Sequence, residues 1–216
     1  MKAVLMKGFG GAEVLQVGET ERPSPSKNQV LIKTKATSVN RPDIIQRQGN
    51  YPPPKGESEI LGLEAAGIID VVGTAVQNFS VGDRVMALVG GGGYGEFVCA
   101  HEDHLIRIPE SMNFEEAACI CETYLTAYLN LFLLGKLNGT EKVLLHGGGG
   151  GVNTAGVQLC KILAPEVIVI VTASPGKMGQ VKNLGVNLVI DYLAEDFSKV
   201  VHDFTDEQGV DVILDH

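Results

Sequence analysis

The chain has 216 residues, of which 44% are hydrophobic and 20% charged, as is ordinary for a folded globular protein. Its net charge of −9 and the lack of a Lys/Arg block disfavour nucleic acid as a partner, because phosphate binding needs a positive surface. Four cysteines in a chain of this length form no dense disulfide framework, which favours a reducing, cytoplasmic setting.

The N-terminal part of the chain predicts a β-rich unit. Residues 1–11 alternate like a strand and lack the apolar core of a signal peptide. Further short strands follow, separated by Gly, Pro and Asp, and such spacing suggests a barrel-like arrangement. The expected strands cover residues 30–39, 66–72, 84–89, 96–100 and 105–108.

A helix is expected to begin at Asn113, which can cap it. Residues 117–135 carry one charge, Glu122, but polar residues interrupt this apolar stretch and no basic cluster flanks it. We therefore expect a buried inter-domain helix here and no membrane span.

In the C-terminal half the pattern of predicted elements changes, and short apolar strands alternate with helices. This pattern predicts right-handed βαβ units and a parallel sheet. We expect two domains, residues 1–113 and 114–216. A dinucleotide-binding fold of the usual type has six strands, so the four found here predict that the second domain is incomplete. The strands are expected at 143–145, 167–171, 188–190 and 210–214, and the helices at 154–163, 177–184 and 196–204.

A glycine run follows the strand at 143–145 and opens the next helix. In that context glycines allow a tight turn and let the backbone approach a pyrophosphate at the helix N-terminus. The alternative is a flexible loop that binds nothing. In the register Gly148-x-Gly150-x-x-Asn153 the last fingerprint glycine is replaced by Asn153. Either the helix stands off the strand or Asn153 makes a local hydrogen bond.

The end of the second strand of this half indicates which dinucleotide is bound. NAD-binding folds carry an acid there for the ribose 2′-hydroxyl. Here the strand ends at Ser174 without an acid, and Lys177 follows. A hydroxyl and a cation suit a 2′-phosphate, so the sequence predicts NADPH. The alternative is that Lys177 is an ordinary exposed lysine.

The chain contains no complete pattern of metal ligands. Cys119-x-Cys121 is too tight for a zinc knuckle, and His101-x-x-His104 has only Glu102 and Asp103 beside it. We expect no metal site.

Several separated motifs resemble the medium-chain dehydrogenase/reductase superfamily, and within it the zeta-crystallin-like quinone oxidoreductases of the tumour-suppressor-inducible group. The resemblance covers the whole chain. It implies a GroES-like catalytic domain and a partial Rossmann (parallel, doubly wound) domain, with the C-terminal part of the chain missing. The motifs are Asn40-Arg41-Pro42-Asp43 with Tyr51, Leu61-Gly62-Leu63-Glu64 with Gly67, Gly82-Asp83-Arg84-Val85, residues 122–127 and the glycine run.

The same resemblance assigns roles to individual residues. Zinc alcohol dehydrogenases of this superfamily have Cys where Asn40 stands and His where Leu63 stands, so a zinc-independent enzyme is implied. Asn40 and Tyr51 would be catalytic. Some zeta-crystallin-like members have Tyr where this sequence has Ile45. Cofactor contacts are implied for Thr126, for Gly148, Gly149, Gly150, Gly151, Val152 and Asn153 at the pyrophosphate, and for Ser174, Lys177 and Tyr192 at the 2′-phosphate.

The predicted function is NADPH-dependent reduction of a small-molecule quinone by hydride transfer in an inter-domain cleft, by a cytoplasmic enzyme that is a homodimer in its full-length form. The Tyr51 hydroxyl or the Asn40 amide could stabilise charge on a quinone oxygen. The alternative for Tyr51 is a ring that stacks in the Pro-rich loop and only lines the pocket. Two alternatives stay open. One is a truncated, non-catalytic nucleotide-binding product, and the other is an enone or aldehyde reductase of the same superfamily.

Overall fold

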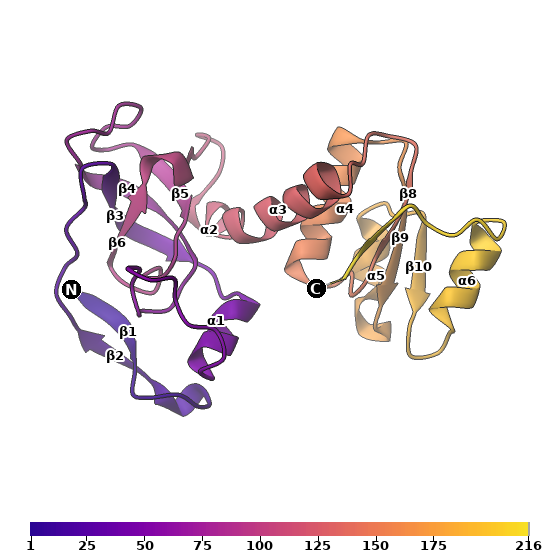
Figure 1. Ribbon diagram of the computed structural model, residues 1–216, viewed down its shortest axis with the longest axis horizontal. Helices are drawn as coiled ribbons and strands as arrows, with labels where there is room; N and C mark the ends of the chain where they lie inside the picture. Colours follow the sequence, from indigo (N-terminus) through magenta and orange to yellow (C-terminus); the bar gives the residue numbers. More distant parts are fainter. Residues whose placement is uncertain (216) are drawn as a thin grey trace. The chain divides into compact units, whose positions relative to one another are not determined.

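A computed structural model describes residues 1–215, and the chain divides into two compact units, Met1–Glu122 and Thr123–His216. Figure 1 shows the antiparallel strands of the first unit in indigo to magenta and the parallel strands of the second in orange to yellow. The predicted fold class, a β-rich unit together with a parallel α/β unit, is confirmed.

The first unit is built on a five-stranded antiparallel sheet with strand order β6-β3-β4-β5-β7. All five strands predicted from the sequence are present, and their ends lie within two residues of the expected ones. The inward side chains of the central strands, such as Val30, Ile32 and Ile69, are almost fully buried and form the core. The strands are β3 (Gln29–Thr37), β4 (Glu64–Val72), β5 (Arg84–Leu88), β6 (Phe97–His101) and β7 (Leu105–Arg107).

An N-terminal hairpin joins β1 (Lys2–Met6) to β2 (Leu15–Glu19) through the short helix η1 (Ala12–Val14). The first strand was expected, whereas β2 was not. Gly18 weakened the strand signal, because glycine is disfavoured inside strands. The structure shows why residue 18 is glycine: a Cβ there would lie 2.7 Å from a methyl carbon of Leu5.

Two short helices flank the sheet of the first unit, and η2 (Glu102–His104) links β6 to β7. Helix α1 (Arg41–Arg47) was not predicted, because seven residues are too few for a periodic signal. Helix α2 (Phe114–Ala117) begins where the sequence indicated. The Glu116 amide donates to Asn113 Oδ1 at 2.7 Å, and the Asn113 amide donates to Glu116 Oε2 at 3.1 Å.

The stretch expected to form a long buried helix is instead α3 (Cys121–Tyr128) followed by the π-helical segment η3 (Leu129–Leu134). The expectation of burial was wrong for one face: Leu125, Leu129, Leu133 and Leu134 are exposed within this chain. Cys121, Ala127 and Leu131 supply the buried face. Among the described residues, no helix is long and apolar enough to cross a membrane.

The second unit is a parallel sheet with strand order β10-β9-β8-β11, and a helix follows each of the first three strands in sequence. All four predicted strands and all three predicted helices are present. Val143, Leu145, Val169 and Val171 form the centre of its core, because strands covered on both faces are apolar throughout. The elements are β8 (Lys142–Leu145), α4 (Gly151–Leu163), β9 (Ile168–Ala173), α5 (Pro175–Asn183), β10 (Leu188–Asp191), α6 (Phe197–Phe204) and β11 (Val212–Leu214).

Candidate active site

The carboxyl ends of the parallel strands form one edge of the second unit's sheet. The strand order reverses beside β8, whose neighbours are β9 and β11. In open parallel sheets, ligands bind outside the carboxyl ends of the strands at such a reversal. The glycine run follows β8 at this edge, which is where a nucleotide is expected to bind.

The glycine turn after β8 is closed by its own hydrogen bonds. The Gly150 amide donates to the Gly147 carbonyl at 2.9 Å, and Gly147 has φ +78°, which favours glycine. The Gly148 amide donates to the Thr172 carbonyl at 2.8 Å, and the Gly147 amide donates to Thr172 Oγ1 at 3.1 Å. The turn is thus tied to the end of β9.

Two of the glycines are required by packing within the protein. A Cβ at Gly148 would lie 2.0 Å from Val171 Cγ1, and a Cβ at Gly149 would lie 2.1 Å from Lys177 Cδ. Both separations are far shorter than a van der Waals contact. These glycines therefore serve the fold itself, and their presence alone does not indicate a ligand.

Asn153, in place of the last fingerprint glycine, makes a local hydrogen bond, one of the two arrangements anticipated from the sequence. Its side chain is fully buried, and Nδ2 donates to the carbonyl of His146. Oδ1 has no hydrogen-bond partner among residues 1–215. Because the side chain points into the protein, the cofactor contact expected of Asn153 is restricted to its backbone.

The first turn of α4 has the features of an anion site. The N-cap residue is Gly150, which has no side chain that could cap the helix. The first amides of α4 carry the positive end of the helix dipole. Lys177 lies at the same turn, where Nζ donates to the Gly149 carbonyl at 3.3 Å. Amides and a cation around one exposed turn fit the pyrophosphate and phosphates of a dinucleotide.

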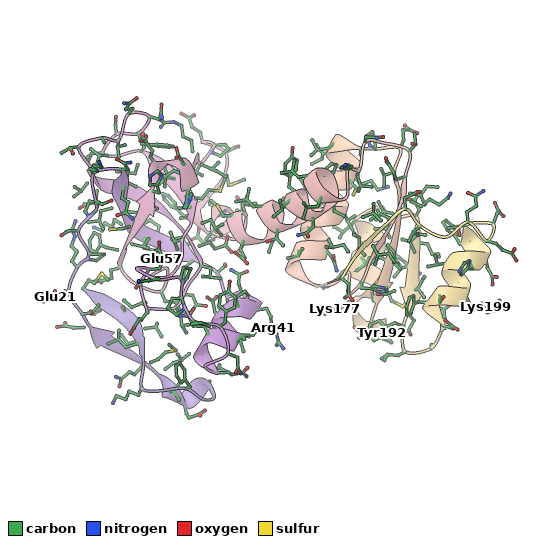
Figure 2. The ribbon with its side chains drawn as sticks, in the orientation of Figure 1. Glu21, Arg41, Glu57, Lys177, Tyr192 and Lys199 are labelled. Carbon is green, nitrogen blue, oxygen red and sulfur yellow. The ribbon has the colours of Figure 1, made fainter. Side chains whose placement is uncertain are left out.

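The remaining cofactor residues expected from the sequence lie in this same unit. Ser174 is the N-cap of α5, directly after β9, and Tyr192 directly follows β10 and is exposed. Figure 2 labels Lys177 and Tyr192 at the same end of the sheet. Thr126 lies on α3, one turn beyond Thr123, whose methyl carbon would be 2.9 Å from a Cβ at Gly151. The structure therefore brings α3 to the glycine turn through Thr123.

Sequence reasoning missed two polar residues that hold the turn. Thr172 is buried at the end of β9, and its Oγ1 lies 3.2 Å from His146 Nδ1. The His146 ring also packs edge-on against Phe197, with 4.9 Å between centroids. The signal in the sequence was Thr172, a lone hydroxyl residue directly after the apolar run 167–171. Thr172 and His146 together support the turn.

In the first unit, Asn40 lies in a buried polar network. Its Nδ2 donates to Glu64 Oε1 at 2.8 Å and to Ser38 Oγ at 3.0 Å, and Ser38 Oγ also donates to Glu64 Oε1. These two acceptors are hydrogen-bonded to each other, so they lie in nearly the same direction from Nδ2, and one amide hydrogen of Asn40 serves both. The second amide hydrogen of Asn40 has no acceptor in this network, and the donor role expected from the sequence stays a prediction.

Three acidic residues surround Asn40. Asp43 is buried and accepts hydrogen bonds from the Asn40 amide (2.8 Å) and the Tyr94 hydroxyl (3.0 Å), and burial and the Asp43 charge raise the Tyr94 pKa. Glu64 Oε2 accepts from the Glu122 amide at 3.0 Å. Burial, followed by the charges of Glu64 and Asp43, raises the pKa of the Glu122 carboxyl above its ordinary value. All three acids occur in motifs noted for the resemblance, but the sequence did not indicate that they converge.

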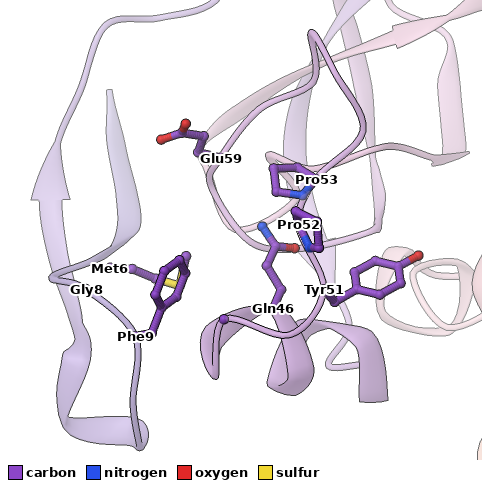
Figure 3. Close-up of a pocket in the computed structure, with 9 residues that line it drawn as sticks. Met6, Gly8, Phe9, Gln46, Tyr51, Pro52, Pro53 and Glu59 are labelled. Carbon is purple, nitrogen blue, oxygen red and sulfur yellow. The ribbon is translucent and has the colours of Figure 1, made fainter.

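Tyr51, the other expected catalytic residue, lies in the loop after α1 and is 43% exposed. Figure 3 shows its ring projecting away from Phe9 and Met6. Within the described residues its hydroxyl has no hydrogen-bond partner, so it is available to an external group.

Within residues 1–215, no three His, Cys, Asp or Glu side chains come together in an arrangement that could hold a metal ion. Cys119-x-Cys121 and His101-x-x-His104 are accordingly not parts of larger clusters there. Burial raises the pKa of the Cys121 thiol to about 12, so this side chain is a protonated, apolar core residue.

Comparison with known proteins agrees with both units. Residues 26–110 match the alcohol dehydrogenase GroES-like domain, and residues 151–216 match the family described as zinc-binding dehydrogenase. The mouse synaptic vesicle membrane protein VAT-1 homolog-like is 36% identical over 215 residues, which cover 100% of this chain and 51% of the mouse protein. The chain thus spans about half the length of the curated relatives it matches.

Solved structures show the same relationship. The Escherichia coli quinone oxidoreductase complexed with NADPH is 31% identical with a TM-score of 0.90, covering 100% of this chain and 66% of that one. The CurK enoyl reductase is 29% identical with a TM-score of 0.91, covering 99% and 66%. With the parallel sheet, the glycine turn and the antiparallel unit in place, these likenesses establish that the chain belongs to the medium-chain dehydrogenase/reductase superfamily.

Proposed function

We propose that this chain belongs to an NADPH-dependent, zinc-independent oxidoreductase that reduces quinones. The observation that carries the proposal is the position of Lys177, whose ammonium group reaches the glycine turn. The residue directly after β9 is Ser174, where NAD-binding folds carry an acid. A cation at this position attracts a 2′-phosphate, whereas an acid would repel it. The likeness to a quinone oxidoreductase complexed with NADPH supports the same assignment.

The proposed cofactor-binding residues are those at the carboxyl edge of the sheet. The backbone from Gly148 to Asn153 would receive the pyrophosphate at the N-terminus of α4. Ser174, Lys177 and Tyr192 would receive the adenosine side, and Thr126 the nicotinamide side. When bound, the cofactor supplies the hydride, and the protein supplies position and polarity.

Tyr51 is the residue we propose to act on the substrate. Reduction of a quinone places negative charge on its oxygen, and a hydroxyl that has no other partner can donate to that oxygen. Asn40 would line the same region. Because Nδ2 is already bonded to Ser38 and Glu64, which hold the Asn40 side chain in place, we propose that Tyr51 is the main donor to the substrate.

Reduction of an enone is the second candidate, favoured by the likeness to the CurK enoyl reductase. The Tyr51 hydroxyl could donate equally well to an enone carbonyl, since the developing charge is of the same kind. We propose a division at residue 113 between catalytic and cofactor domains and a homodimer for the full-length form. A cytoplasmic location is proposed too, although the relatives named above carry a vesicle-membrane name.

The test is a fluorescence titration of the 216-residue chain with NADPH and, in parallel, NADH, with circular dichroism to confirm folding. Saturable binding that favours NADPH supports the assignment. NADPH oxidation is then followed with a quinone and with an enone as alternative acceptors. A folded chain that binds neither cofactor would overturn the proposal for this chain and favour a non-catalytic product. Preference for NADH would overturn the role of Lys177.

A further inference from the structure

The first unit contains a pocket of about 400 Å³ between the N-terminal hairpin and the loop that carries Tyr51. A volume of this size is typical of small-molecule sites. Its walls are mainly apolar, as in Figure 3, and its polar side chains are Gln46, Glu59 and Tyr51, whose hydroxyl points away. The side chains used below are Met6, Phe9, Gln46, Pro52, Pro53 and Glu59.

The walls of this pocket are held by reciprocal hydrogen bonds. The Gly10 amide donates to the Arg47 carbonyl at 3.0 Å, and Arg47 Nε donates to the Gly10 carbonyl at 3.1 Å. The Phe9 ring lies against Gly49, where a Cβ would be 2.9 Å from the ring and where φ is +86°. The hairpin and the end of α1 are therefore joined beside the pocket.

Gln46 is the unusual residue of this pocket. It is only 2% exposed, and neither Oε1 nor Nε2 has a hydrogen-bond partner among residues 1–215. A buried amide without partners is energetically unfavourable, since its hydrogen bonds to water are lost and not replaced. In Figure 3 the amide rises from α1 between Phe9 and Pro52, while the Tyr51 hydroxyl points away.

We propose that this pocket binds a neutral aromatic or aliphatic ring that carries a carboxamide or lactam group. Gln46 offers one acceptor and two hydrogens in a plane, so an amide can donate to Oε1 and accept from Nε2 at the same time. The apolar walls of Met6, Phe9, Pro52 and Pro53 would cover the ring. Glu59 adds negative charge, which disfavours a carboxylate ligand.

Tyr51, the proposed donor to the substrate, also lines this pocket, but the ligand proposed here is recognised by Gln46, which has no part in the proposed hydride transfer. All of its residues lie within Met1–Glu122, and no cofactor is needed to complete it. Binding needs a small movement of the side chains over the amide, and Phe9, at 70% exposed, has little packing to lose. The inference therefore does not depend on the proposed function.

The test is a titration of the ¹⁵N-labelled 216-residue chain with benzamide, and separately with benzoate, followed by NMR. The Gln46 side-chain resonance is assigned in the native chain, labelled with ¹³C and ¹⁵N, by through-bond experiments. We expect benzamide to shift that resonance saturably, benzoate to bind at least tenfold more weakly, and Gln46→Met to weaken benzamide binding at least tenfold. Gln48→Met makes the same change at an exposed position two residues away and should bind like the native chain.

Three results would overturn the proposal. They are an unshifted Gln46 resonance on benzamide addition, benzamide binding by Gln46→Met that equals the native chain, and benzoate binding that equals benzamide binding. The first needs only the native chain, so it decides the matter even if Gln46→Met does not fold. NADPH titration of the same samples keeps the two proposals apart, because Gln46→Met should leave cofactor binding unchanged.

Discussion

Lys177 lies across the glycine turn: its ammonium group donates to the Gly149 carbonyl at 3.3 Å, and its stem occupies the space where a Cβ of residue 149 would be. A residue of the second βα connection therefore forms part of the turn after the first strand. This relationship explains why residue 149 is glycine and places a cation next to the N-terminus of α4.

Lys177→Ala is expected to weaken NADPH binding about tenfold or more, because a hydrogen bond or ion pair with a charged group contributes about 1.5–3 kcal/mol. NADH lacks the 2′-phosphate, so its binding should change little. Fluorescence titration with both cofactors measures the difference. Lys182→Ala, in the last turn of the same helix, is the matched control. An equal loss for both cofactors would show that Lys177 does not recognise the 2′-phosphate.

Tyr51→Phe is expected to lower kcat for quinone reduction at least tenfold while leaving NADPH affinity nearly unchanged, since removal of one donor to a developing oxyanion costs about 10²–10³ in kcat elsewhere. Steady-state kinetics with saturating NADPH provide the measurement. Tyr128→Phe removes an exposed hydroxyl outside the proposed site and serves as control. An unchanged kcat would mean that Tyr51 only lines the substrate region and does not donate to the substrate oxygen.

Gly148→Ala is expected to destabilise the second unit by about 1–3 kcal/mol, the usual cost of forcing an extra methyl group into a packed region. The new Cβ would lie 2.0 Å from Val171 Cγ1, on a fully buried strand. Gly176→Ala adds the same methyl to open space within α5 and should be neutral or stabilising. Urea unfolding followed by circular dichroism compares the two. Equal stability of both variants would contradict the tight packing of the turn.

Asn153→Asp is expected to destabilise the chain increasingly as pH rises. The introduced carboxyl would be buried and would face the His146 carbonyl, so its protonated form would be favoured and its folded-state pKa raised above the unfolded value. Stability is then retained below the unfolded pKa and lost as pH rises through the folded pKa. Unfolding experiments between about pH 4 and pH 8 test this. Asn153→Leu, which cannot ionise, should show no added pH dependence.

Glu122→Gln is expected to stabilise the chain at neutral pH. Burial, Glu64 and Asp43 raise the pKa of Glu122 above its ordinary value of 4.5. The folded state therefore holds this proton more tightly than the unfolded state, and ionisation lowers stability as pH rises from 4.5 through the raised pKa. The gain should disappear at about pH 4, where Glu122 is protonated in both states. Glu110→Gln, at an exposed loop position, is the control, and an equal gain at both pH values would exclude the charge as its cause.

The sequence alone determined the strands of both units, the helices of the second unit and the glycine turn. These depend on local patterns: apolar runs of strand length, the Asn113 cap and glycines between a strand and a helix. Helix α1 was not predicted because its seven residues give no clear period. Strand β2 was not predicted because Gly18 interrupts its strand signal.

Only the tertiary structure decided what the polar residues do. Asp43, Glu64 and Glu122 are separated along the chain, yet hydrogen bonds join them: Asp43 accepts from the Asn40 backbone amide, and Glu64 accepts from Asn40 Nδ2 and from the Glu122 amide. The Asn153 side chain turns inward to His146, and Gln46 is buried without a partner. Hydrogen bonding and burial depend on which segments pack together, and that is settled by long-range contacts with no counterpart in local sequence.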